Sequence, residues 1–357
     1  MAHVGVIFGG RSVEHQVSIR SARTVVQGLR DAGHQVTPLG IAQDGCWIDA
    51  EASEAVLSGG IAAIAPLELP IAPTLRHLLA SGVEVLFPIV HGTWGEDGTL
   101  QGLCEMIDVA YVGPGVTASA LAMDKLLFKR QMIAAGVPVV EYEAVTRREM
   151  ETDPAAFLER ARKLTFPVFV KPSVGGSSVG VKKVESPDCL ETGVRFALQF
   201  DETVIVERGV KGRELECAVL GYGRIEASVV GEIVPGNDFY DYADKYLQDT
   251  ARLIAPAELS PETTGRLRDA AVRAFEAIGG VGLARVDFLV EGDEGVYVNE
   301  INTLPGFTSI SMYPRLWGLS GIPLPELVDR LVRIAIERHR DRRRLDQGIK
   351  DFLSALI

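Results

Sequence analysis

The sequence predicts a mixed fold, in which an α/β unit is followed by α+β units, and three stretches carry this expectation. Near the N-terminus, an apolar strand over residues 3–8, a helical pattern over 17–32 and a second strand over 35–39 form a β-α-β unit, which implies a parallel sheet covered by helices. Residues 213–234 have the pattern of antiparallel strands. Residues 283–302 hold two alternating apolar runs around a Gly-rich turn, which indicates a β-hairpin.

The elements between these stretches follow from apolar periodicity and from Gly and Pro punctuation. A helix is predicted over residues 119–135, because Gly136 and Pro138 supply helix stop signals. A long loop is predicted over 235–252, and residues 42–70 are rich in Ala, Gly and Pro and receive no assignment. The remaining predicted strands are 83–90, 110–112, 168–171, 179–184 and 203–207, and the remaining predicted helices are 100–107, 153–163, 186–199, 261–278 and 324–343.

The composition is that of a globular protein with a sizeable core, because 47% of the 357 residues are hydrophobic and 24% are charged. This length predicts two or three domains. The net charge of −12 argues against a general polyanion-binding surface, so an anionic ligand would have to meet local Lys and Arg side chains. The one basic run, Arg338–Arg344, is interpreted as the solvated end of a helix, with a nucleic-acid role as the alternative.

Cysteine usage and the N-terminal residues point to a cytoplasmic protein. The four cysteines are scattered and form no CxxC pair, so neither a zinc site nor a redox motif is indicated, and reduced thiols fit best. The chain enters a strand directly, without a basic leader or a cleavage site, and it has no apolar run of about 18 residues. We therefore expect a protein that neither spans a membrane nor follows the secretory route.

The predicted hairpin brings the most informative side chains together. If its strands pair symmetrically about the turn, Asp287 faces Glu300 and Arg285 faces Asn302, and side-chain alternation puts all four on one face. Opposed carboxylates repel each other, and a hard cation such as Mg²⁺ would remove that repulsion and also hold substrate phosphates. The alternative is a solvated face that carries acids by chance. The other face is expected to be core and carries Val286, Phe288, Val290, Tyr297 and Ile301.

A Gly- and Ser-rich loop spans Lys171–Gly180 between two predicted strands. Glycines let backbone N–H groups approach phosphate oxygens, and serine hydroxyls add donors. The loop is not a Walker A motif, because Gly-Lys-Ser/Thr is missing and a strand follows. Lys171 and the upstream Lys125 would supply the positive charge that a triphosphate requires. The alternative is a flexible turn with two surface lysines.

Three further features are candidates for substrate contacts. Glu14 follows the first strand of the parallel sheet, where ligands bind, and would take an ammonium group; the alternative is a carboxylate favoured by the dipole of the following helix. Residues 239–246 are aromatic and charged within the long loop and are interpreted as a lid, with a surface loop of packed tyrosines as the alternative. Arg285 and a backbone N–H near Gly306 would form an oxyanion clamp; the alternative is a capped turn.

Taken together, these features resemble the D-alanine–D-alanine ligases of the ATP-grasp superfamily, from Val4 to about Leu331. Each motif alone is modest, but their order and spacing are specific. The motifs that carry the resemblance are Gly9-Gly10 with Glu14 and Val17-Ser18, His91-Gly92 with Gly95–Gly102, Ser119–Lys125, Val170–Ser173 with Gly176–Gly180, Tyr240–Tyr242 with Lys245-Tyr246, Arg285–Asp287, and Asn299–Gly306.

The resemblance implies a three-domain ATP-grasp fold. Its N-terminal parallel-sheet (pre-ATP-grasp) domain would span residues 1–123, its central subdomain 124–212 and its C-terminal subdomain 213–357, with ATP between the last two. The implied reaction joins two D-alanines to D-alanyl-D-alanine through an acyl phosphate, for peptidoglycan precursor synthesis. The implied partners are D-alanine, ATP and a second copy in a homodimer, with neither nucleic acid nor membrane.

The resemblance also assigns roles to residues by their positions in these motifs. Catalytic roles fall to Glu14, which takes the ammonium of the first D-alanine, to Ser177 and Tyr246, which join it in a triad that closes the lid, and to Arg285, which stabilises the tetrahedral intermediate. Substrate contacts fall to His91, Gly306 and Ser311. ATP contacts fall to Lys125, Lys171, Ser178, Glu207, Arg208, Glu214 and Lys245. Two Mg²⁺ (or Mn²⁺) ions would be held by Asp287, Glu300 and Asn302.

Two stretches depart from the family pattern. Val174-Gly175 stands where many relatives have a charged residue, which predicts different contacts between loop and lid, and residues 41–80 are longer than in the short-form relatives. Lys245-Tyr246 favours the dipeptide-forming branch over the depsipeptide-forming one. The alternatives are another ATP-grasp carboxylate–amine ligase and a catalytically silent nucleotide-binding protein, and the metal-type residues with Arg285 disfavour the silent protein.

Overall fold

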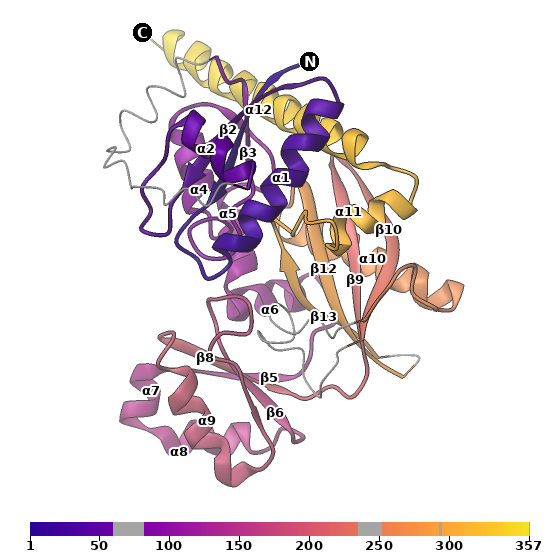
Figure 1. The fold of residues 1–357 in the computed structure, drawn as a ribbon. Coiled ribbons are helices and arrows are strands. Elements are labelled where there is room, and N and C mark those ends of the chain that lie inside the picture. Colours follow the sequence, from indigo (N-terminus) through magenta and orange to yellow (C-terminus); the bar gives the residue numbers. More distant parts are fainter. Residues whose placement is uncertain (60–81, 235–251, 293–294, 357) are drawn as a thin grey trace.

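The computed structural model describes residues 1–59, 82–234, 252–292 and 295–356. Within these residues the strands form three sheets, one parallel and two antiparallel. Figure 1 shows the sheet that contains β5, β6 and β8 below the other two, with α12 along the top of the molecule. The lid predicted at residues 239–246, which includes Lys245 and Tyr246, lies outside the described residues.

The N-terminal sheet is parallel, as the β-α-β pattern predicts, and has the strand order β2-β1-β3-β4. Its strands are β1 (His3–Gly9), β2 (Gln35–Ile41), β3 (Val85–Pro88) and β4 (Ala110–Tyr111). Its helices are α1 (His15–Asp31), α2 (Ala50–Leu57), α4 (Thr99–Met106) and α5 (Val116–Met123). Ile19, Ala22, Val26 and Leu29 of α1 are buried, because their spacing puts them on one face of the helix.

The central sheet is antiparallel and has the strand order β5-β8-β6-β7. Its strands are β5 (Tyr142–Thr146), β6 (Val168–Pro172), β7 (Lys182–Val184) and β8 (Thr203–Arg208). Its helices are α7 (Arg147–Thr152), α8 (Pro154–Ala161) and α9 (Leu190–Ala197). β7 begins later than predicted, because the residues before it belong to the glycine loop, where Ser177 and Ser178 have positive φ angles of 52° and 59°.

The C-terminal sheet is antiparallel and has the strand order β11-β10-β9-β12-β13. Its strands are β9 (Arg213–Tyr222), β10 (Arg224–Val234), β11 (Arg252–Ile254), β12 (Gly282–Glu291) and β13 (Gly295–Asn302). Its helices are α10 (Pro261–Ala277), α11 (Met312–Leu319) and α12 (Leu324–Ser354). Leu267 and Phe275 of α10 pack with Val286 and Phe288 of β12 in a buried cluster.

The single helix predicted over residues 119–135 is two helices, α5 and α6 (Lys125–Ala134). Asp124 separates them, because its ψ of 105° is extended and its side chain caps α6 by accepting hydrogen bonds from the backbone N–H groups of Leu126 and Leu127. The Lys125 N–H donates to Ser173 O at 2.8 Å, so the break joins the start of α6 to the glycine loop. Stop signals at the end of a helix do not reveal such an internal cap.

The hairpin of β12 and β13 has the predicted pairing at its functional end and a shifted pairing near its turn. The register changes between Asp287 and Phe288, so that Phe288 faces Val298. This β-bulge puts Val296 and Val298 in the core in place of Tyr297, so the prediction that Tyr297 is a core residue is wrong. Tyr297 is half-buried, and its ring centroid lies 5.6 Å from the guanidinium carbon of Arg208.

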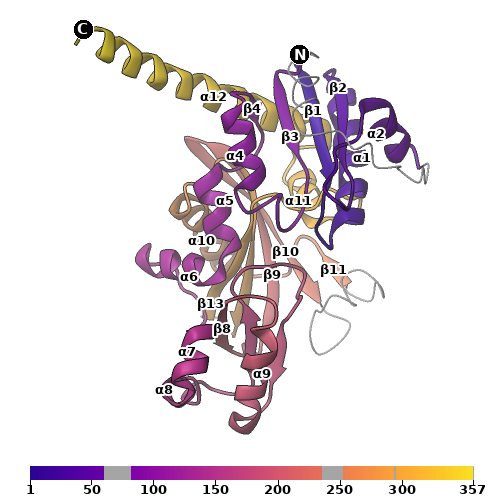
Figure 2. The ribbon, with the colours of Figure 1, turned by 90° about the vertical axis from the view of Figure 1, so that its left-hand side faces the viewer.

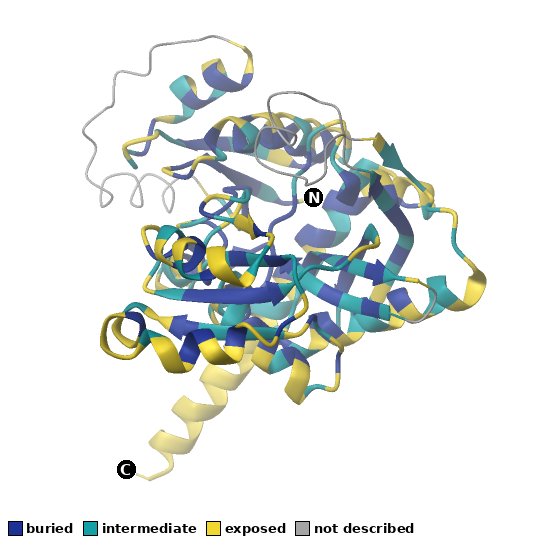
Figure 3. Ribbon diagram, turned by 90° about the horizontal axis from the view of Figure 1, so that it is seen from below, coloured by how far each residue is buried: buried dark blue, intermediate teal, exposed yellow. Residues whose placement is uncertain are grey.

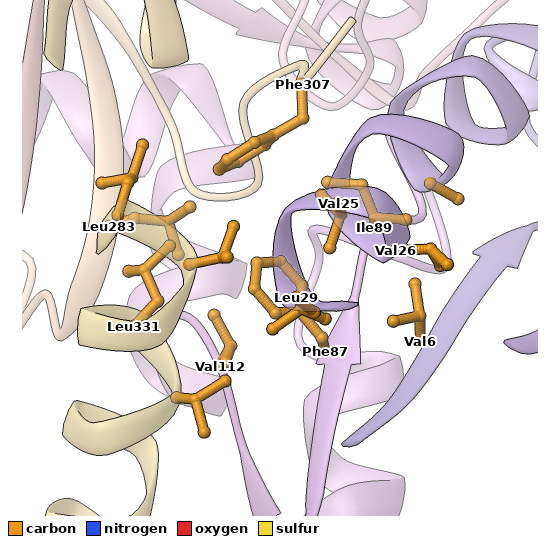
Figure 4. Close-up of a cluster of buried hydrophobic side chains, with 14 of the residues drawn as sticks. Val6, Val25, Val26, Leu29, Phe87, Ile89, Val112, Leu283, Phe307 and Leu331 are labelled. Carbon is orange, nitrogen blue, oxygen red and sulfur yellow. The ribbon is translucent and has the colours of Figure 1, made fainter. Parts of the chain in front are cut away.

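The largest hydrophobic cluster joins the N-terminal sheet to the C-terminal sheet (Figure 4). It contains Leu29 of α1 and Phe87 of β3 together with Leu283 of β12 and Leu331 of α12, all fully buried. Phe307, from the loop after β13, packs edge-on against Phe87 with ring centroids 6.1 Å apart. Burial of each such side chain contributes roughly 1.5–3 kcal/mol to the free energy of folding. This cluster therefore holds the loop after β13 against the N-terminal sheet.

Helix α12 is longer than predicted, and its last turns extend away from the body of the protein (Figures 2 and 3). The interpretation of the basic run as merely solvated is wrong for Arg338, because its guanidinium carbon lies 4.0 Å from the ring centroid of Tyr111 and its Nη1 donates to Gly113 O at 2.6 Å. Arg342 forms an ion pair with Glu105 at 2.8 Å. The run therefore attaches α12 to the N-terminal sheet. Among the described helices, none has the length and apolarity that a membrane span requires.

Candidate active site

One cleft, with a volume of about 790 Å³, is lined by residues from all three sheets and their loops. Every described residue of the predicted site lies on its wall, although these residues are scattered along the chain. They are Glu14, His91, Lys125, Lys171, Ser177, Ser178, Glu207, Arg208, Glu214, Arg285, Asp287, Glu300, Asn302, Gly306 and Ser311. The fold therefore brings the sequence-predicted side chains to one space.

A row of three carboxylates follows the register of three adjacent strands. Glu216 of β9 pairs with Asp287 of β12, which pairs with Glu300 of β13, so the predicted pairing of Asp287 with Glu300 is confirmed. Asn302 donates from Nδ2 to Asp287 Oδ2 at 3.0 Å. Within the described ranges no three His, Cys, Asp or Glu side chains are gathered to hold a metal by themselves. Carboxylate and amide oxygens still fit a hard cation such as Mg²⁺, which takes its other ligands from water and phosphate.

Arg285 places a fixed positive charge beside this row. Its Nε and Nη2 donate to the two carboxylate oxygens of Asp287, each at 2.7 Å, and Nε also lies 3.1 Å from Glu216 Oε1. Burial alone would lower the pKa of Arg285, but the carboxylates of Asp287 and Glu216 raise it well above its usual range. The guanidinium is therefore charged and oriented by two carboxylates at once.

Three lysines lie around Glu207 and the glycine loop. Lys125 Nζ donates to Gly175 O at 2.6 Å, and Lys171 Nζ donates to Glu207 Oε2 at 2.5 Å. Lys129 Nζ lies 2.8 Å from the other carboxylate oxygen, Glu207 Oε1. Burial would raise the pKa of Glu207, but Lys129 and Lys171 hold it at about 2. Glu207 is thus shared between two ammonium groups, and the carboxylates of Glu300 and Glu214 add negative charge near Lys171.

The glycine loop and Glu14 approach each other at the cleft. A Cβ atom added to Gly176 would lie 3.7 Å from Glu14 Oε2, and one added to Gly92 would lie only 2.9 Å from the same oxygen. Glu14 immediately precedes α1, but its side chain makes no capping hydrogen bond. Its carboxylate instead lies between the loop of Gly92 and the loop of Gly176, where Ser177 follows.

His91 fixes the loop that follows β13. It is buried, and burial lowers its pKa, so the ring is neutral. Nδ1 donates to Leu304 O at 2.8 Å, which leaves Nε2 to accept from the Ser21 hydroxyl at 3.0 Å. Ser21 Oγ in turn accepts from the backbone N–H of Phe307 at 3.1 Å. Both ring nitrogens of His91 are thus engaged in positioning the backbone around Gly306.

Glu96 ties the same loop to the N-terminal sheet from a second side. Its Oε1 accepts from the Leu304 N–H at 3.0 Å, and its Oε2 accepts from the Gly92 N–H at 2.6 Å. Burial and the nearby charge of Glu14 raise the pKa of Glu96 to about 8. A buried carboxyl group in these surroundings therefore binds its proton at neutral pH more readily than an exposed one does.

Ser311 and Gly306 are neighbours at the end of this loop. A Cβ atom added to Gly306 would lie 2.8 Å from Ser311 Oγ, which is closer than a side chain tolerates. Ser311 Oγ accepts from the Thr308 N–H at 2.9 Å. The glycine thus leaves its own backbone accessible beside a serine hydroxyl.

Arg208 lines the cleft and pairs with Glu291, a different carboxylate from the one that the lysines share. Its Nη1 and Nη2 donate to the carboxylate of Glu291 at 3.1 and 3.0 Å, and these bonds raise its pKa. The predicted contacts of Arg208 and Glu214 with ATP stay predictions.

Sequence reasoning missed several charged residues of the cleft region, among them Lys129 and Glu216. Lys129 lies four residues after Lys125 on α6, a spacing that puts both lysines on one face of a helix. Glu216 lies two residues after Glu214 on β9, a spacing that puts both carboxylates on one face of a strand. Each spacing could have identified the second residue once the first was assigned.

A parallel N-terminal sheet followed by two antiparallel sheets, with a cleft of lysines and carboxylates among them, is the architecture of the ATP-grasp class of enzymes. The structure of the D-alanine-D-alanine ligase from Coxiella burnetii has a TM-score of 0.82 and 34% identity, with 99% of each chain covered. The crystal structure of VanG D-Ala:D-Ser ligase from Enterococcus faecalis also has a TM-score of 0.82, with 32% identity over 94% of this chain and 99% of that chain.

Sequence comparison defines the family within this class. Residues 3–114 match the model of the D-ala D-ala ligase N-terminus, and residues 132–333 match that of the C-terminus. The D-alanine–D-alanine ligase of Solibacter usitatus is 45% identical, with 95% of this chain and 97% of the relative covered. D-alanine–D-alanine ligase A of Escherichia coli is 43% identical, with 94% and 96% covered. This chain belongs to the D-alanine–D-alanine ligase family.

Proposed function

We propose that this chain uses ATP to join two D-alanine molecules into D-alanyl-D-alanine, a component of peptidoglycan precursors. The observation that carries the proposal is the shared cleft, in which Glu14, two lysines and Arg285 line one space. Lys125 and Lys171 offer positive charge to phosphates, and Glu14 offers a carboxylate to an ammonium group. Such a reaction needs no nucleophilic side chain, because the substrate and ATP supply the reacting atoms and the protein supplies positioning and charge.

In the first step, the carboxylate of one D-alanine attacks the γ-phosphoryl group of ATP, which gives an acyl phosphate and ADP. Glu14 binds the ammonium of this D-alanine, and Lys125 and Lys171 bind the phosphates. Ser178 and the backbone of the glycine loop donate to phosphate oxygens. The positive φ angle of Ser178 shows that the backbone turns here instead of continuing as a strand.

In the second step, the amine of the second D-alanine attacks the acyl carbonyl, and inorganic phosphate leaves. Arg285 and the Gly306 N–H stabilise the oxyanion of the tetrahedral intermediate, while Ser311 receives the carboxylate of the second D-alanine. His91 contributes by holding the backbone near Gly306. Ser177, Tyr246 and Lys245 close the lid, which matters because water would hydrolyse the acyl phosphate.

The remaining site residues bind the nucleotide and its cation. Two Mg²⁺ (or Mn²⁺) ions, when bound, neutralise phosphate charge, and Asp287, Glu300 and Asn302 would hold them. Asp287 would then share its oxygens between Arg285 and the cation, and Glu216 would remain a carboxylate partner of Arg285. Glu207, Arg208 and Glu214 contact the adenine and ribose of ATP.

We also propose that the chain has domain boundaries at residues 123/124 and 212/213 and that it works in the cytoplasm as a homodimer. The break at Asp124 supports the first boundary, because it separates α5 from α6. The net charge of −12 disfavours nucleic acid as a partner.

The decisive experiment measures phosphate release by the purified protein with ATP and Mg²⁺. D-alanine alone should support release, and D-alanine with D-serine or D-lactate should add little. Release only when D-lactate is added would move the chain to the depsipeptide-forming ligases. Release only with D-serine would assign the activity named for the Enterococcus faecalis structure. ATP binding without release on any of these would support a silent nucleotide-binding protein.

A further inference from the structure

Lys129 is a buried cation that the proposed reaction leaves without a role. It belongs to α6 and is 1% exposed, so its ammonium group has been moved almost completely out of water. Its Nζ atom lies 2.8 Å from Glu207 Oε1 and 5.5 Å from the ring centroid of Tyr142. Burial lowers the pKa of Lys129, and the carboxylate of Glu207, which acts in the opposite direction, is the partner that favours the charged ammonium.

The partner of Lys129 is also the partner of Lys171. Glu207 gives Oε1 to Lys129 and Oε2 to Lys171, at 2.8 and 2.5 Å, and is itself 2% exposed. Lys171 is the more open of the two lysines, with 15% of its side chain exposed against 1% for Lys129, and it lines the cleft. Glu207 therefore connects a cation at the cleft wall with a cation behind it.

The sharing of Glu207 contributes to the charge that the cleft presents, together with the nearby carboxylates of Glu300 and Glu214. Without Lys129, Glu207 and Lys171 would form an ion pair of net charge zero, and both carboxylate oxygens could bind the Lys171 ammonium. With Lys129 on one oxygen, the group of three carries a net charge of +1, and Lys171 keeps N–H donors for a ligand. In a buried site of low dielectric, one unit of charge near a bound anion has a large effect.

We propose that Lys129 is a positioning residue for the nucleotide: it holds one oxygen of Glu207 and so leaves Lys171 positively charged toward the phosphates. The inference rests on the proposed function only in taking the anion to be the triphosphate of ATP. The plainer alternative is that Lys129 is a structural member of a buried ion pair whose loss would only lower stability.

The test uses Lys129→Met, which keeps the length of the side chain and removes its charge, with Lys129→Arg as the charge-retaining variant. The matched control is Lys163→Met, because Lys163 is an exposed lysine of a surface pair and its loss changes the net charge equally. Affinity for ATP with Mg²⁺ is measured by titration in the absence of D-alanine. KM for ATP and KM for D-alanine are measured separately.

Lys129→Met should weaken ATP binding roughly tenfold or more, raise KM for ATP and leave KM for D-alanine within about twofold. Lys129→Arg should recover most of the affinity, and Lys163→Met should match the wild type. Unchanged ATP affinity in Lys129→Met would overturn the proposal. An equal rise in both KM values, or a loss that Lys129→Arg does not recover, would support the structural alternative instead.

If Lys129→Met does not fold, a second comparison tests the proposal. Lys129→Met with Glu207→Gln removes both members of the pair and is compared with Glu207→Gln alone, so that any direct contact of Glu207 with the nucleotide is missing from both. Because Lys129 acts through the charge of Glu207, the double variant should bind ATP within about twofold of Glu207→Gln, and a further loss of about tenfold would contradict the proposal. A wild type that binds ATP but releases no phosphate with D-alanine would refute the proposed reaction and still allow this test; one that does not bind ATP would refute both.

Discussion

Asp287 lies directly across the β12–β13 pair from Glu300, and both of its carboxylate oxygens are held by Arg285. Two facing carboxylates are therefore not left to repel each other, because a guanidinium compensates one of them. The same contact couples two proposed functions, since Asp287 would bind a cation and Arg285 would bind the reacting carbonyl. A cation at Asp287 would share these oxygens with Arg285, and Glu216, which is 3.1 Å from Nε of Arg285, would remain a carboxylate partner of the guanidinium.

Replacement of Asp287 by Asn should abolish turnover while the fold is largely kept. Asn retains the size of Asp and one oxygen but loses the charge that a divalent cation needs, so we expect phosphate release to fall by at least about a hundredfold. Thermal melting should change little, because Arg285 retains Glu216. Asp346→Asn, an exposed substitution on α12, is the control for an Asp-to-Asn change. Wild-type turnover in Asp287→Asn would refute the metal assignment.

Replacement of Glu216 by Gln should affect the chemical step more than binding. Gln keeps the shape of the side chain, but Arg285 then keeps only Asp287 as a contacting carboxylate, and Asp287 would also hold the cation. We expect kcat to fall roughly tenfold, while KM for ATP and for D-alanine changes less, because a misoriented oxyanion donor weakens the transition state more than the ground state. Steady-state kinetics check this, with the more exposed Glu226→Gln on β10 as the control. A rise in both KM values at constant kcat would argue for a role in binding instead.

Replacement of Arg338 by Met should lower stability without altering the cleft. Arg338 stacks on Tyr111 and donates to the carbonyl oxygens of Gly113 and Tyr111, so its loss removes a cation–π contact and two hydrogen bonds. We expect a loss of about 1–3 kcal/mol in the free energy of unfolding, seen by denaturant titration, with kcat unchanged. Arg340→Met, at an exposed position of the same run, should have almost no effect. Equal losses in both variants would show that general charge, and not this contact, stabilises α12.

The sequence allowed prediction of those features that depend on local pattern. Strand alternation around one turn is sufficient to pair Asp287 with Glu300, and a β-α-β pattern is sufficient for a parallel sheet. The bulge that turns Tyr297 out of the core depends on a shift of one residue between two strands. The alternation of apolar and polar residues along each strand does not predict such a shift. The contact of Lys129 with Glu207 joins α6 to β8, two elements whose packing is tertiary. The break at Asp124 is a cap within an otherwise continuous helical pattern.

The pH dependence of stability should reveal the buried Glu96. Its pKa is about 8 in the folded protein, against an ordinary value of 4.5, because it is buried and lies near the charge of Glu14. Between these two pH values the folded protein binds more protons than the unfolded chain, so this residue makes stability fall as the pH rises toward 8 and adds no further change above it. At low pH both states are protonated, and the effect is absent.

Glu96→Gln isolates this contribution, because an amide does not titrate. The variant is less stable by an amount that does not depend on pH. The reason is that one of the two backbone donors, the N–H of Gly92 or of Leu304, then faces an NH₂ group instead of an acceptor. Melting temperatures of both proteins are therefore compared from pH 5 to pH 9, and the difference between them is followed. The advantage of the wild type should shrink as the pH rises toward 8 and then remain constant. An advantage that stays level, or that grows with pH, would show that Glu96 is ionised throughout and that its two N–H donors outweigh burial.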